Sequence, residues 1–592
     1  MELVSRKKNS AKSVAASLIL NIIKVIAQFI FRSVFIHYLS VEYLGVNSAI
    51  TSVINMLNVT ELGLTSVIVF NLYKPVLDGD QKKINSIVAF YKKIFAVIGL
   101  VVLAIGLGVL PFLDKLVTIS SDITVNITVV YLLMLASAVL SYFFSYRNVL
   151  FIAYQELYKS NIITIFVYTL GITLEFLAVI VFKNYYAYLG ATILSNLINY
   201  FVFYFCTIKL YPQVKIIGAQ KLDKATKSEI NRNLKGMVYH KFSSVVLQAS
   251  DTLIISAFIG SFYLGVYSNY SLFTVNLITV FSLISTALAG SIGNLIAEGN
   301  KEKSYRIYQN LKLIFFWLAG FCAVCLTVLF NPAIALWAKL GHWDQSVNWV
   351  MDNFTIVIIV LNFFIYASRI ITGTFRECVG NFDKDRFKGV IEAIINIIVS
   401  IALVKPLGIA GVLIGTIVSC LCTSIWVDPL MVYKYHFKKP LWLHFRDILI
   451  YFGTTVVVCV ITYLLCGFIP SATVGWFILK VIACITVSMA LFTLAYFKTP
   501  MFKDLKNMLV NSLKERRLRH ASADTSVVVE SDIAESGANN CDIESSNNIS
   551  GVDNEPTNNS DYTNLGKDID GECAEDNLDN ITDDTTVEKK NN

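Results

Sequence analysis

The tetrapeptide YLGV occurs twice in this chain, in "HYLSVEYLGVNSAI" (residues 37–50) and in "FIGSFYLGVYSNYS" (residues 258–271). The two copies, Tyr43–Val46 and Tyr263–Val266, lie 220 residues apart. A four-residue match between two apolar segments does not by itself distinguish coincidence from duplication. The flanking sequence decides between them.

The 220-residue offset continues beyond the tetrapeptide. It aligns "PVLDGDQKKINS" (75–86) with "LIAEGNKEKSYR" (295–306), and upstream it aligns Gln28 with Gln248. A coincidental match would not keep an ungapped register through two apolar segments and a polar loop. We therefore interpret the chain as one unit used twice, and this interpretation decides the fold.

The composition indicates a polytopic membrane protein. Of 592 residues, 55% are hydrophobic, and stretches such as "FAVIGLVVLAIGLGVLPFL" (95–113) are long enough and apolar enough to be transmembrane helices. Fourteen spans are predicted, at 13–37, 45–73, 88–112, 124–148, 161–182, 187–208, 241–262, 265–296, 311–338, 347–373, 389–404, 408–433, 447–469 and 474–497.

The fold class is therefore all-α, with two parallel six-helix repeats and two C-terminal helices. Six spans separate the copies, so both halves cross the membrane in the same direction. Parallel repeats around a central site are a transporter architecture. The predicted domains are 1–210 and 241–434 for the bundles, 211–240 for the loop between them, 435–500 for the extra helices and 501–592 for a tail.

Lysine and arginine gather in the N-terminal segment and in alternate loops, which predicts that both termini are cytoplasmic. No loop on the other side exceeds about a dozen residues, so we expect no catalytic domain there and no enzyme activity. Residues 521–592 hold 18 Asp and Glu against three Lys and Arg, which predicts an acidic, disordered end to the tail.

Ionisable residues inside spans are costly and mark candidate sites. In the first span Asn21, Lys24, Gln28 and Arg32 share one helical face. Two further polar stripes are predicted. Their members are Ser244, Gln248 and Asp251 in the seventh span, and Asn47, Thr51, Asn55, Asn58 and Glu61 in the second.

Each of these charges also has a structural interpretation. Lys24 can pair with Glu61 as a packing contact, and Arg32 can extend to the membrane surface. Arg147 and Arg369 match at offset 222, and they either anchor their spans or flank a vestibule. Guanidinium groups in a vestibule would suit a pyrophosphate. The cationic first span favours an anionic substrate.

No cofactor or metal site is predicted. Cys322 and Cys325 form a CxxC pair inside an apolar span, without further ligands at suitable spacing. Asp251 and Glu61 remain available for binding a cation or proton.

Two segments carry a resemblance to a known family. "ELGLTSVIVFNLYKPVLDGDQKKINSIVAFYKK" (61–93) resembles part of bacterial polysaccharide-biosynthesis membrane proteins, as does "FRECVGNFDKDRFKGVIEAIINIIVSIALVKPLGIAGVLIGTIVS" (375–419) with "WVDPLMVYKY" (426–435). These are lipid-linked oligosaccharide flippases of the multidrug/oligosaccharidyl-lipid/polysaccharide exporter superfamily, especially its Gram-positive branch. The resemblance covers roughly residues 10–500.

The resemblance implies a flippase that moves an undecaprenyl-diphosphate-linked oligosaccharide to the outer leaflet. Its partners would be that lipid, membrane lipids and glycan-synthesis proteins, with no nucleic acid. By position, diphosphate contacts fall to Lys24, Arg32, Arg147 and Arg369. We call the segments 375–419 and 426–435 the branch motif. Gating or helix-end roles fall to four of its residues, namely Arg386, Glu392, Asn396 and Asp428.

Two other functions compete with the flippase. One is a cation-coupled multidrug-type exporter that uses Asp251 and Glu61, and the other is a membrane scaffold that recruits enzymes through its acidic tail. The cationic stripe argues against the first, and the duplicated polar stripes argue against the second.

Overall fold

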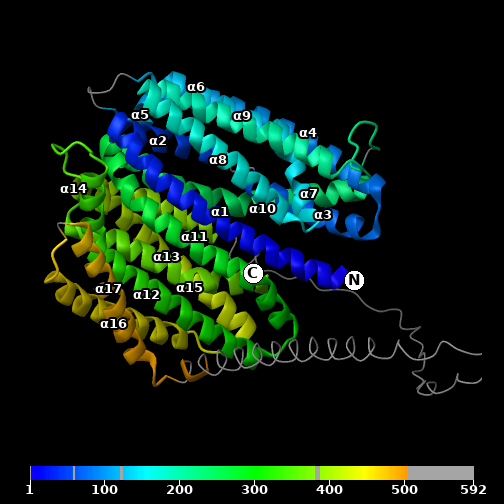
Figure 1. Ribbon diagram of the computed structural model, residues 1–592. Helices are drawn as coiled ribbons and strands as arrows, with labels where there is room; N and C mark the ends of the chain where they lie inside the picture. Colours follow the sequence, from blue (N-terminus) through cyan, green and yellow to red (C-terminus); the bar gives the residue numbers. More distant parts are fainter. Residues whose placement is uncertain are drawn as a thin grey trace, which may run out of the picture. The chain divides into compact units, whose positions relative to one another are not determined.

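The computed structural model describes an all-α chain (Figure 1). The described residues are 2–57, 61–119, 125–220, 222–380, 387–471, 473–499 and 502–504, with side chains left out at 2–11, 14, 61–64, 66, 225, 229, 231–244 and 248. The side chains of Glu61 and Gln248, all of Arg386 and most of the predicted tail therefore lie outside the described part.

The long helices follow the apolar segments of the sequence. Their bounds are α1 Glu2–Tyr38, α2 Val41–Leu57, α3 Glu61–Asp78, α4 Gln81–Val109, α6 Ile127–Phe144, α8 Leu157–Phe182, α9 Tyr185–Leu210, α10 Lys224–Phe258, α11 Ser261–Ala297, α12 Lys301–Leu340, α13 Asn353–Val379, α14 Lys388–Cys422, α16 Trp442–Gly467 and α17 Val474–Tyr496. Short helices α5 Leu113–Leu116, α7 Val149–Ala153 and α15 Ser424–Leu430 lie between them, with a π-helical turn at Met431–Phe437.

Eleven helical segments of the described chain are long and apolar enough to cross a membrane. The predicted span 45–73 covers most of α2 and α3, with residues 58–60 between them outside the described part. The span 241–262 falls in α10, in which Val245–Phe258 is apolar. The two spans at 389–404 and 408–433 fall in the segment Lys388–Phe437, on the two sides of a break at Gly408. The protein is an all-α membrane protein, and the count of fourteen remains a prediction.

Helix α14 is broken at Gly408. This residue has φ 57° and ψ −135°, a conformation open to glycine and strained for other residues. Pro406 precedes it by two positions and removes a backbone donor from the same turn. The break folds the two halves of α14 together, since the Ser400 hydroxyl donates to the Val412 carbonyl oxygen at 3.0 Å.

Local geometry repeats at the 220-residue offset. Gly79 and Gly299 both adopt positive φ, 69° and 72°, between consecutive helices. The next residue caps the following helix in each case: Asp80 accepts a hydrogen bond from the Lys83 amide at 2.9 Å, and Asn300 accepts one from the Lys303 amide at 3.0 Å. The same turn is thus built twice by matching residues.

The two YLGV copies pack directly against each other, in a contact that we call the α2–α11 crossing. A Cβ atom on Gly45 would lie 1.8 Å from the Ser261 carbonyl oxygen, and one on Gly265 would lie 2.2 Å from the Val41 carbonyl oxygen. Ser261 is the 220-residue counterpart of Val41, so the contact is reciprocal. Glycine is required on both helices because their backbones touch.

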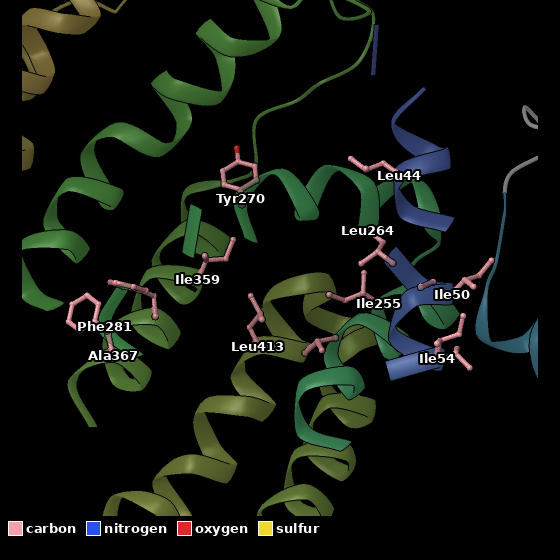
Figure 2. Packing of buried hydrophobic residues seen from close by; sticks show 14 of the residues in the cluster. Leu44, Ile50, Ile54, Ile255, Leu264, Tyr270, Phe281, Ile359, Ala367 and Leu413 are labelled. Carbon is pink, nitrogen blue, oxygen red and sulfur yellow. The ribbon is translucent and has the colours of Figure 1, made fainter. Parts of the chain in front are cut away.

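From the crossing toward its C-terminal end, α2 contributes to a continuous apolar core. Figure 2 shows Leu44, Ile50 and Ile54 of α2 beside Ile255 of α10 and Leu264 of α11. All five side chains are buried. Helix α2 therefore joins the first half of the chain to α10 and α11 of the second half.

Candidate functional site

The predicted stripe on α1 reaches the second half of the chain. Arg32 donates from Nη1 to the Ser268 carbonyl oxygen at 2.5 Å, with the Ser268 hydroxyl at 3.2 Å and Asn269 Oδ1 at 3.3 Å. Both partners belong to α11. Arg32 therefore bonds to protein atoms of the opposite half rather than extending to the membrane surface.

Lys24 lies on the same helix, about two turns from Arg32. Its Nζ atom is 5.6 Å from the centre of the Tyr168 ring on α8, a cation–π distance. Within the described residues it has no hydrogen bond or ion pair, and the side chain of its predicted partner Glu61 lies outside them. Gln28, between Lys24 and Arg32, is partly exposed.

The end of α1 is held by tryptophans of the second half. Trp337 Nε1 donates to the Ser33 hydroxyl at 2.5 Å, and Trp343 Nε1 donates to the Ser33 carbonyl oxygen at 3.3 Å. One turn further, His37 Nδ1 lies 3.0 Å from the His342 carbonyl oxygen. These contacts and the α2–α11 crossing close the two halves together where α1 ends and α2 begins.

Sequence reasoning missed Ser33, Trp337 and Trp343. Tryptophan near a span end is a recognisable signal for an interface position, but it does not identify the partner. The Ser33 contact became visible only with the helices in place.

Asp251 lies in a polar cluster between α10 and α14. Thr416 Oγ1 is 2.9 and 2.8 Å from the two carboxylate oxygens of Asp251. Asn396 Nδ2 donates to Thr416 Oγ1 at 2.8 Å and lies 3.5 Å from Asp251 Oδ1, while Ser250 donates to Asn396 Oδ1 at 2.7 Å. Two predicted residues, Asp251 and Asn396, thus meet across 145 positions of sequence.

The Asp251 cluster is rich in oxygen. No basic side chain forms an ion pair with Asp251 in the part of the chain that the structure describes, although its neighbours donate hydrogen bonds. A carboxylate of this kind can hold a proton or a hard cation. The coupling role of Asp251 remains a prediction.

Arg147 lies in a 3₁₀ segment, Ser145–Asn148, with 7% of its surface exposed. Its Nη2 atom is 3.4 Å from the Val214 carbonyl oxygen, and the guanidinium is 5.9 Å from the centre of the Tyr204 ring. No acidic side chain pairs with it among the described residues. The guanidinium is enclosed by protein atoms of the first half.

Arg369, its counterpart at offset 222, has a different environment. Arg369 Nη1 lies 3.4 Å from Glu392 Oε1, and the other Glu392 oxygen accepts a hydrogen bond from the Ser424 hydroxyl at 2.6 Å. The pair joins α13, α14 and α15. The matching sequence positions therefore do not give matching charges, because Glu392 neutralises only the second arginine.

Asp428 completes this charged region of the second half. Lys388 Nζ lies 2.5 Å from Asp428 Oδ1, and Arg376 Nε lies 3.8 Å from the same oxygen. Glu392 and Asp428 of the branch motif thus bind basic side chains of their own half. Gating and helix-end pairing both remain predicted roles for these residues.

Comparisons with solved structures find the same fold in transporters. The chain aligns with a structure described as "Lipid II flippase MurJ, inward closed conformation" at TM-score 0.61 and 13% identity, covering 81% of this chain and 98% of that one. An inward-facing multidrug resistance MATE family transporter of the MOP superfamily gives TM-score 0.56 and 15% identity, with coverages of 71% and 98%.

A MOP superfamily transporter from Pyrococcus furiosus gives TM-score 0.51 and 14% identity, with 74% of this chain and 97% of that one covered. No protein-family model matches the chain, and no curated protein matches it. The chain therefore has the fold of these MOP superfamily structures. The MOP superfamily is the multidrug/oligosaccharidyl-lipid/polysaccharide exporter superfamily of the sequence resemblance.

Proposed function

We propose that this protein is a flippase that moves an undecaprenyl-diphosphate-linked oligosaccharide from the inner to the outer leaflet of a bacterial membrane. The observation that carries the proposal is the cationic stripe of α1. Arg32, near the C-terminal end of α1, reaches α11 of the opposite half. Lys24, about two turns before it, has no acidic partner among the described residues. An anionic head group between the halves would meet both side chains.

The proposed mechanism is alternating access between two six-helix bundles. With the predicted cytoplasmic termini, the end where α1 meets α2 faces outward, so the described conformation is closed on the outside. The diphosphate enters from the cytoplasmic leaflet and binds Lys24. Opening of the outer end breaks the bonds of Arg32 to Ser268 and Asn269, and the released guanidinium can bind phosphate oxygens bidentately.

The membrane potential favours this direction of transport. Each negative charge that moves outward across a membrane with a negative interior gains about 2.3 kcal/mol per 100 mV. Because the diphosphate is anionic, its export needs less free energy from any coupled ion. Lipid tails would stay outside the bundles while the glycan crosses between them.

We expect Lys24→Gln to slow transfer of the lipid at least about tenfold. A hydrogen bond to a charged group contributes about 1.5–3 kcal/mol, and about 1.4 kcal/mol corresponds to one factor of ten. The measurement is the appearance of undecaprenyl-diphosphate-oligosaccharide in the outer leaflet of vesicles that hold the purified protein.

Lys115→Gln is the matched control, because Lys115 is an exposed cation of a loop helix, away from the α1 stripe. It should keep the native rate. A native rate in Lys24→Gln would remove Lys24 from the binding site. Failure of the native protein to move the lipid would overturn the flippase proposal itself.

A cation-coupled small-molecule exporter is the second candidate, and the Asp251 cluster is the observation in its favour. Asp251→Asn keeps the size of the side chain and its bonding to Thr416 while removing the charge. If Asp251 binds the coupling ion, we expect this variant to lose the part of transport that an imposed proton or sodium gradient stimulates. Transport of an organic cation along such a gradient by the native protein, without lipid transfer, would favour the exporter.

A further inference from the structure

Helix α12 has one side covered by the two C-terminal helices. We call this side the accessory face of α12, made by Lys312, Phe316, Gly320 and Cys325. Lys312 is fully buried, with Nζ 2.7 Å from Asp447 Oδ2 of α16. Phe316 packs on Tyr451 with ring centres 5.2 Å apart, and Cys325 Sγ lies 3.9 Å from Cys484 Sγ of α17.

The middle of this face has no spare room. A Cβ atom on Gly320 would lie 2.7 Å from Thr455 Oγ1 of α16 and 3.0 Å from a ring carbon of Phe492 of α17. The two helices are therefore closely packed onto α12, and the buried Lys312–Asp447 pair fixes their position along it.

Helix α4 is the counterpart of α12 at the 220-residue offset, and the turns that begin the two helices are built alike. Their core-facing residues also match. Phe95 and Phe315 are both buried, as are Gly99 and Ala319. The same side of each helix therefore faces the interior of its own bundle.

The counterpart of the accessory face is uncovered in the described chain. Lys92, Leu100 and Ile105 correspond to Lys312, Gly320 and Cys325, and Lys92 is exposed. Leu100 is 58% exposed and Ile105 is 55% exposed, while Val97 beside them is 60% exposed. We call this surface the α4 face.

Lys92 distinguishes the α4 face from an ordinary lipid-facing surface. It occupies the position at which Lys312 binds a carboxylate of a neighbouring transmembrane helix. Its one described contact is a cation–π approach, 5.8 Å from the centre of the Tyr146 ring, and no acidic group pairs with it among the described residues. Helices in membranes associate through packing and through polar contacts of this kind.

We propose that the α4 face binds a transmembrane helix of another membrane protein, with an Asp or Glu of that helix paired to Lys92. The partner helix would take the place on α4 that α16 takes on α12. A second copy of this chain is a poor occupant of the same face, because two α4 faces in contact would bring Lys92 against Lys92.

Photocrosslinking in cells that produce the protein natively tests this proposal. The probe is p-benzoylphenylalanine at Leu100, with the same probe at Phe166 of α8 as the matched control, since Phe166 is 68% exposed. We expect a discrete adduct with a different protein from Leu100 alone. The crosslinked peptide should be an apolar segment that carries an Asp or Glu.

Charge reversal then tests the pairing. Lys92→Glu should lower the adduct yield about tenfold, and replacing the partner's acid by lysine should restore it. Lys92→Glu should keep the native rate of lipid transfer in vesicles, which verifies that it folds. Adducts with lipid only, equal yields from Phe166, an adduct with a second copy of this chain, or a yield that Lys92→Glu leaves unchanged would overturn the proposal.

Discussion

Replacing Gly45 or Gly265 by alanine is expected to lower the rate of lipid transfer by more than about tenfold. The added Cβ atoms would lie 1.8 Å from the Ser261 carbonyl oxygen and 2.2 Å from the Val41 carbonyl oxygen. Both neighbours are backbone atoms, which cannot rotate away as a side chain does. The α2–α11 crossing would have to separate, at a cost of about 1–3 kcal/mol for overpacking of this kind.

The separation acts on transport because the crossing joins the two halves. In the proposed mechanism this end closes before substrate enters from the cytoplasm, so a crossing that cannot close leaves the transporter open to the outside. A penalty of about 1.4 kcal/mol shifts such an equilibrium tenfold. Each alanine substitution alone should therefore lower the rate of lipid transfer.

The readout is the reaction of an Asn47→Cys side chain with a thiol reagent that does not cross membranes. It should react faster from outside in the alanine variants than in the parent. Gly293→Ala, on the same helix α11, is the matched control because nothing lies within 4 Å of its added Cβ atom. Equal thiol reactivity and native transport in Gly45→Ala would show that the crossing is not a gate.

The sequence predicted the duplication but not the contact between its copies. An offset of 220 residues shows which positions are equivalent, and the matching turns at Gly79 and Gly299 agree with it. Equivalence does not indicate where the two halves touch. The reciprocal fit of Gly45 and Gly265 depends on how the halves are placed in space, which local sequence does not encode.

The arginines illustrate a second limit. Arg147 and Arg369 were predicted to act alike because they match at offset 222. Glu392 gives Arg369 a partner. The first-half positions that correspond to Glu392, residues 170–172, are Leu-Gly-Ile and carry no acid. The arginine is repeated in both halves but the acidic partner is not, and an alignment that follows the arginines alone does not reveal this.

Polar stripes were predictable as faces of helices, because the helical period alone places Lys24, Gln28 and Arg32 together. Their partners were not. The meeting of Asp251 with Asn396 and Thr416 depends on the break of α14 at Gly408, which folds one half of that helix back along the other. The predicted spans 389–404 and 408–433 already place the break, but they do not show which side chains meet across it.

The largest effect on stability is expected at the buried ion pair of the accessory face. Asp447→Asn should lower the free energy of unfolding by about 3–5 kcal/mol, since it leaves the charge of a buried lysine without its partner. Lys312 is fully buried and Asp447 has 5% of its side chain exposed, so water cannot replace the lost carboxylate. The measurement is unfolding of the purified protein in mixed micelles by titration with a denaturing detergent.

Two further variants separate loss of the pair from loss of packing. Lys312→Met with Asp447→Leu removes both charges and keeps apolar volume, and it should recover most of the stability, because a buried pair contributes little beyond an apolar replacement. Glu302→Gln breaks an exposed pair with Lys439, in which Glu302 is 78% exposed, and should cost less than about 1 kcal/mol. If the double variant were as unstable as Asp447→Asn, the shape of α16 at this point, rather than charge pairing, would hold the accessory helices on α12. In that case Lys92 of α4 would no longer indicate an acidic partner, because only the charge pairing at Lys312 makes its counterpart a pairing position.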